Sequence, residues 1–135
     1  MYVFQKNGDD SELQSCLDLA IENEDRSSED LARQGLYFSS DDVFRSSCIQ
    51  YLGTLNLITE KDIVKGLEDE SEIVRIEAIS IAEYYESNSV DKKLSEICFD
   101  EKDEFTLAQI MFVLGVKEVN CDYNVLKSED VTNFV

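Results

Sequence analysis

The chain has 135 residues, with 30 Asp and Glu against 12 Lys and Arg, a formal net charge of -18, no histidine and no proline. This length fits a single domain over residues 1–135, and a hydrophobic content of 43% can supply a core, which argues against disorder. An acidic surface repels phosphate groups, so the composition argues against nucleic acid and membranes as partners and favours a basic protein. The alternative is that the charge serves solubility alone.

The first residues lack the apolar run of a secretory signal, and no segment approaches the roughly 20 apolar residues of a membrane span. We therefore expect a cytoplasmic protein. The cysteines form no C-x-x-C pair, and without histidine the usual zinc ligand sets are missing. We predict no metal and no cofactor, and reduced structural thiols at Cys16, Cys48, Cys98 and Cys121.

Apolar residues recur at helical spacing along the chain, and polar start signals precede most of these segments. Residues 10–24 form a first helix that caps one end of the fold, with Leu13, Cys16 and Leu17 on its inward stripe. Thr59, followed by acidic residues, is a typical N-cap. We predict three antiparallel pairs, at 28–38 with 40–52, 59–67 with 71–85, and 90–99 with 103–115, followed by a closing helix over 121–135.

The second helix of each pair repeats one phrase. Asp42-Val43-Phe44-Arg45 recurs as Glu72-Ile73-Val74-Arg75, and a weaker third copy begins at Asp103 with Thr106 in place of the arginine. Self-similarity at such a period is typical of stacked helical repeats.

Asp69, Val74-Arg75, Ala78 and Ile81-Ala82 together resemble the HEAT repeat, including its Asp-to-Arg spacing. The first copy has Ser39 instead of the aspartate, and the third keeps Asp100 but lacks the arginine. The resemblance implies an all-α fold, an α-solenoid (α/α superhelix) of about three HEAT-like helix pairs with N- and C-terminal capping helices. It also implies that the second helices line an inner surface and that Asp and Arg connect neighbouring repeats.

Acidic residues cluster at the turn that enters each second helix, and stacking would align these turns into one acidic ridge. Carboxylates near helix N-termini gain roughly 0.3 to 1 kcal/mol each, which accounts for one or two per turn but not for the four between positions 68 and 72. We therefore predict a partner-binding surface. Its residues are Asp41, Asp42, Asp69, Glu70, Glu72, Asp103 and Glu104 on the ridge, with Ile76 and Glu83 on the inner face.

The sequence favours binding over catalysis. Without histidine the common general base and the usual triads are missing, and no phosphate-binding loop motif occurs. By size, charge and scaffold the chain resembles bacterial immunity proteins that neutralise a cationic nuclease toxin, including those of contact-dependent growth inhibition systems. That resemblance implies a monomer that binds its toxin 1:1. The alternatives are an adaptor for a basic or amphipathic segment of a protein complex and a nucleic-acid mimic.

Overall fold

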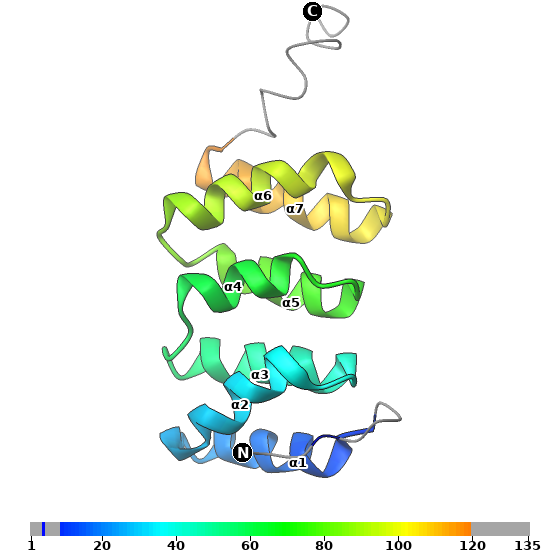
Figure 1. Ribbon diagram of the computed structural model, residues 1–135. Coiled ribbons are helices and arrows are strands. Elements are labelled where there is room, and N and C mark those ends of the chain that lie inside the picture. Colours follow the sequence, from blue (N-terminus) through cyan, green and yellow to red (C-terminus); the bar gives the residue numbers. More distant parts are fainter. Residues whose placement is uncertain (1–3, 5–8, 120–135) are drawn as a thin grey trace, which may run out of the picture.

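The computed structural model describes residue 4 and residues 9–119 (Figure 1). The prediction of an all-α fold is confirmed, because these residues form seven α-helices and one short 3-10 helix, and no strand occurs among them. The predicted closing helix at 121–135 lies outside the described residues. The elements are α1 (Ser11–Glu22), η1 (Arg26–Ser28), α2 (Glu29–Phe38), α3 (Asp42–Thr54), α4 (Glu60–Leu67), α5 (Glu72–Ala82), α6 (Asn88–Asp100) and α7 (Glu104–Lys117).

Polar side chains start the helices as the sequence predicts. Thr59 caps α4 and forms a reciprocal capping box with Asp62, in which each side chain accepts the other's backbone N–H. Asp41, Ser87 and Asp103 cap α3, α6 and α7 by accepting an N–H three residues on. These bonds satisfy backbone donors that a helix start would otherwise leave unpaired.

The helices lie in layers that succeed one another along the molecule (Figure 1). Helix α2 packs on α3, α4 on α5 and α6 on α7, while α1 packs on α3 at one end. Between layers, α3 contacts α5 and α5 contacts α7, and on the other side α2 contacts α4 and α4 contacts α6. The structure therefore has one row made of α3, α5 and α7, and a second row made of α2, α4 and α6.

The core fills the space between these two rows and includes the fully buried side chains of Phe44, Tyr51 and Leu36. The sequence placed Cys16 on the inward stripe of α1, and this was wrong, because Cys16 is exposed while Leu17 is buried. Cys48 is a buried free thiol, as predicted. Cys98 is disulfide-bonded, so the prediction of a reduced thiol was wrong there.

Asp41, Ser71 and Asp103 hold the same N-cap position of α3, α5 and α7, and this fixes the register between the three layers. Counting from these caps, Leu107 and not Thr106 occupies the position of the two arginines. The sequence prediction of Thr106 was therefore off by one residue. Thr106 is instead fully buried and donates its hydroxyl to Asp103.

Two arginines join successive layers in the same way. Arg45 donates to the carbonyl oxygen of Ser39 in its own layer and to the carboxylate of Asp69 in the next. Arg75 repeats this with the carbonyl of Asp69 and the carboxylate of Glu101. The two arginines therefore connect neighbouring layers, as the sequence predicted. The sequence assigned the acid of the third layer to Asp100, whereas Asp100 is exposed and Glu101 forms the bonds.

Candidate protein-binding site

The structure divides the predicted acidic ridge into internal and exposed members. Asp41 is buried and accepts N–H groups from Phe44 at 3.1 Å and from Asp10 at 2.8 Å. Asp69 is buried and its two carboxylate oxygens bind Arg45 at 2.9 Å each. The prediction that Asp41 and Asp69 form part of an exposed ridge was therefore wrong. The physical reason is that helix capping and a desolvated ion pair use these carboxylates inside the protein.

Two further ridge residues are bonded within the fold. Asp42 accepts the hydroxyl of Ser71, the N-cap residue of the next helix in the row, at 2.7 Å. Asp103 accepts the backbone N–H and the hydroxyl of Thr106, and these bonds lower the pKa of the carboxyl. Both side chains are half-buried. Asp42 serves the stacking of the row, Asp103 caps its own helix, and both contribute only partly to the surface charge.

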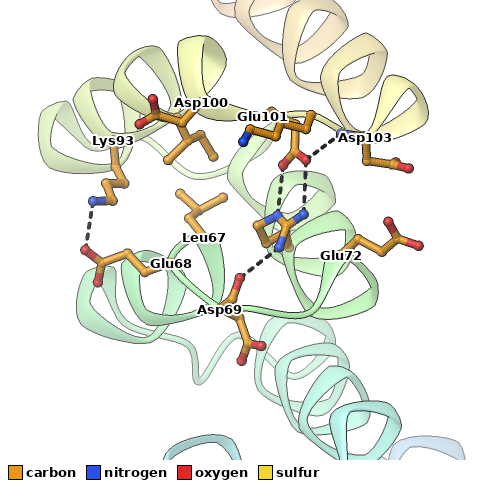
Figure 2. A pocket seen from close by; sticks show the side chains of 11 residues that line it. Leu67, Glu68, Asp69, Glu72, Lys93, Asp100, Glu101 and Asp103 are labelled. Atoms are coloured by element: carbon orange, nitrogen blue, oxygen red, sulfur yellow. Dashed lines mark hydrogen bonds and ion pairs between the residues drawn. The ribbon is translucent and has the colours of Figure 1, made fainter.

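A groove of about 610 Å³ lies between the turn that joins α4 to α5 and the turn that joins α6 to α7 (Figure 2). Arg75 crosses it from Asp69 to Glu101, and Lys93 pairs with Glu68 at 2.7 Å on its other side. Charges of opposite sign thus pair within the groove. We interpret it as part of the connection between layers, because Arg75 and Lys93 each bind a carboxylate of the neighbouring layer across it.

The remaining predicted residues lie at or near the surface. Glu70, Glu72 and Glu104 are exposed, and Ile76 and Glu83 are half-buried. Glu72 and Glu104 hold the first position of α5 and α7, as Asp42 does in α3. One carboxylate therefore stands at the start of each helix of the row, where the helix dipole also favours negative charge.

Exposed apolar side chains follow these acids in register. Val43 and Ile73 are each 44% exposed and Phe105 is 84% exposed, and they hold the second position of α3, α5 and α7. Further along α7, Phe112 and Val116 are 63% and 55% exposed, and Val116 is in register with Tyr84, which follows α5. We call the surface formed by these positions the α3–α5–α7 face. Of the apolar residues near this surface, the predicted partner-binding set included Ile76 and did not include Phe105 or Val116.

The register between layers shows that Val43, Ile73 and Phe105 belong to a lateral face and not to the end of the stack. Val43 of α3 and Ile73 of α5 remain exposed although α5 packs against α3 and α7 packs against α5. Phe105 holds the same position in α7, so a further layer beyond α7 would leave it exposed as well. Met111 is the opposite case. It is exposed, but the equivalent residues Ile49 and Ile79 are fully buried between layers.

The three helices of this row carry three cations, and all three are bound internally. Arg45 pairs with Asp69, Arg75 with Glu101, and Lys117 with Asp91 and with the carbonyl of Tyr85. Within the described part of the chain, no ion pair is seen for Glu72, Glu77 or Glu104 on the same helices. The row therefore presents anionic and apolar groups, and its cations lie within the fold.

Glu77 is a member of this face that the sequence analysis did not single out. Its register equivalent in α7, Gln109, donates to Ser80 of the preceding layer at 2.7 Å. Glu77 is half-buried, and burial raises the pKa of its carboxyl. Aligning α5 with α7 from their N-caps would have shown that Glu77 and Gln109 occupy the same position in their helices. Its partial burial depends on the neighbouring helices, which the sequence of α5 does not describe.

Comparisons of the chain with protein-family models, with curated proteins and with solved structures give no match. None of the helices that the structure describes has the length and apolar character needed to cross a membrane. Among residue 4 and residues 9–119, no group of three or more Cys, Asp or Glu side chains is arranged to hold a metal ion.

Proposed function

We propose that this protein is a non-catalytic binding module for a basic protein, and that the partner is a nuclease toxin which it neutralises by covering the active site. The observation that supports this most directly is the charge distribution on α3, α5 and α7. Their cations Arg45, Arg75 and Lys117 are paired inside the fold, whereas Glu72, Glu77 and Glu104 are left without an ion pair among the described residues. A cationic surface would supply the missing partners.

The overall charge supports the same proposal. At a net charge of -18 the protein attracts cationic proteins over several ångströms and raises the rate of encounter, while it repels the nucleic acid that a nuclease would bind. A toxin site built to bind phosphate is cationic, so an anionic inhibitor can occupy it in place of the substrate. We further infer that the layers are HEAT-like repeats of an α-solenoid with capping helices at its ends. The repeated Arg45–Asp69 and Arg75–Glu101 bonds support this.

The second candidate is an adaptor that binds a basic or amphipathic segment of a larger complex. The exposed apolar positions on the same face favour it, because Phe105 and Phe112 would serve a stable interface as well as a transient one. A nucleic-acid mimic needs charges spaced like phosphates, and the apolar residues between the acids of this face argue for a protein ligand.

The test begins with capture of binding proteins on the immobilised protein, using lysate of the source organism and a wash at increasing salt. The captured protein is then purified and assayed for nuclease activity with and without added inhibitor. The matched variants are Glu72→Lys with Glu104→Lys on the proposed face and Glu12→Lys with Asp18→Lys on α1. Each pair reverses two carboxylates, so both change the net charge equally, and all four residues are exposed.

The proposal requires capture of a basic nuclease whose activity falls when the protein is added, and association slowed by the first variant pair but much less by the second. Capture of a stable assembly without nuclease activity would contradict the toxin proposal and favour the adaptor. Equal binding by both variant pairs would show that the α3–α5–α7 face is not the interface.

A further inference from the structure

We infer that the α5–α7 part of this face binds an amphipathic α-helix of the partner, with its apolar side against Phe105, Phe112 and Val116 and its Lys or Arg residues against Glu72, Glu77 and Glu104. The inference rests on the proposed function and adds the structure and chemistry of the segment that is recognised. It assigns the energy of binding to apolar residues outside the predicted set of partner-binding residues.

The apolar residues form a strip along α7 that its own layer does not cover. Phe105, Phe112 and Val116 are the second, ninth and thirteenth residues of the helix and recur at roughly helical spacing, so they lie on one side of it. Their exposed fractions are 84%, 63% and 55%. Ile73 and Tyr84 extend this strip onto α5 at matching positions. Large exposed apolar side chains gathered on one face are typical of an interaction site.

The same strip holds two phenylalanines and a tyrosine. Aromatic side chains bury much area at a small cost in rotamer entropy, and for that reason they are frequent among the few residues that dominate binding energy. A basic partner held by surface charge alone would be released by salt. Contact with Phe105 and Phe112 would keep the complex together when the charges are screened.

We expect the partner segment to be a helix because this face offers no free backbone N–H or C=O groups. The face is formed by the sides of helices, whose backbone N–H and C=O groups are already bonded within each helix. An extended peptide would leave its own backbone groups without partners against such a surface. A helix satisfies its backbone internally and needs only side-chain contacts. The strip from Phe105 to Val116 is roughly 16 Å long, which matches about three turns of a partner helix.

Charge completes the match between this face and its ligand. Glu72 and Glu104 stand at the N-terminal end of the strip, Glu83 and Glu118 lie toward its other end, and Glu77 is half-buried beside it. The cations of the three helices are paired inside the fold. A helix with a Leu- or Phe-rich side and flanking Lys or Arg would thus meet apolar side chains in the middle and carboxylates at both margins.

The experiment uses three synthetic peptides of about 14 residues, roughly 21 Å as helices. The first places Leu at helical spacing with Lys elsewhere, the second alternates the same Leu and Lys as a strand would, and the third replaces Lys by Glu in the helical pattern. Binding of each fluorescently labelled peptide to the full chain is measured by anisotropy at low and at moderate salt. The variants are Phe105→Ala, Phe112→Ala and the control Phe38→Ala, which removes a 71% exposed phenylalanine on α2.

The inference predicts that the helical Leu/Lys peptide binds most tightly and that Phe105→Ala and Phe112→Ala each weaken it about tenfold, at both salt concentrations. Phe38→Ala and wild type should bind alike. Equal binding of the helical and alternating peptides, or equal loss with Phe38→Ala, would overturn the inference. If charge reversal at Glu72 and Glu104 still weakened binding, the proposed basic partner would remain and only the apolar helix site would fail. If that reversal also had no effect, both proposals would fail.

Discussion

The guanidinium of Arg45 forms two hydrogen bonds of 2.9 Å with the carboxylate of Asp69 in the next layer, and both side chains are almost fully buried. Asp69→Asn would leave a buried cation without its counter-charge, and we expect a loss of about 3 kcal/mol of unfolding free energy. Urea titration followed by circular dichroism measures it. The control is Glu68→Gln, which weakens an exposed pair with Lys93 and should cost under about 1 kcal/mol.

A loss no larger for Asp69→Asn than for Glu68→Gln would show that this pair does not join the layers. The same geometry makes Asp69 unsuitable for charge reversal as a test of binding. A lysine at that position would face Arg45 inside the protein and unfold the stack. Reversal at Glu72 and Glu104, which are exposed, separates binding from stability.

Two helical glycines provide a matched test of packing. A Cβ on Gly66 would lie 2.6 Å from Cδ1 of Ile49 and 2.8 Å from Cβ of Ala78, and the latter atom has no rotamer that moves it away. We expect Gly66→Ala to cost about 1 to 3 kcal/mol by overpacking. A Cβ on Gly115 would meet no atom within 4 Å, so Gly115→Ala should gain about 0.5 to 1 kcal/mol from helix propensity. Thermal unfolding of the two variants checks both signs, and equal shifts would contradict the contact between α4 and α5.

Glu77 should make the protein less stable at neutral pH than at mildly acidic pH. Burial raises the pKa of its carboxyl in the folded state, so the folded protein binds this proton more tightly than the unfolded chain does. Stability from this group is present below the unfolded pKa of about 4.3 and is lost as pH rises through the folded pKa. Glu77→Gln removes the effect. We expect it to stabilise the protein more at pH 7 than at pH 4 in paired urea titrations, and a gain independent of pH would contradict this account.

The free cysteines should react with a thiol reagent at very different rates. Cys16 is exposed on α1, whereas Cys48 is fully buried in α3 and burial raises the pKa of its thiol. With an absorbance-based thiol reagent, Cys16 should be modified rapidly in the native protein and Cys48 only at the rate of unfolding. Cys16→Ser serves as the control and should abolish the rapid phase. A rapid phase that survived in this variant would show that the core opens near Cys48.

The sequence predicted the helices well because their signals are local. Thr59 and Asp103 cap helices at the expected positions, and the repeated phrase at Asp42 and Glu72 marks equivalent helices in two layers. Caps and apolar periodicity depend on residues three or four apart, which one helix contains. Cys16 shows the limit of that reasoning, since a stripe of moderate width does not say which of its edges the neighbouring helix will cover.

The sequence by itself determined the all-α fold, the negative charge and the repeat, because each follows from composition or from spacing along the chain. Only the tertiary structure decided which carboxylates are buried and bonded within the fold. Asp69 and Glu70 are adjacent in a charged turn, yet one is buried against Arg45 and the other is exposed. The difference arises because layers meet on one side of that turn. The exposure of Phe105 was decided in the same way, because exposure depends on which helix packs against a position. Such contacts join residues far apart in the chain.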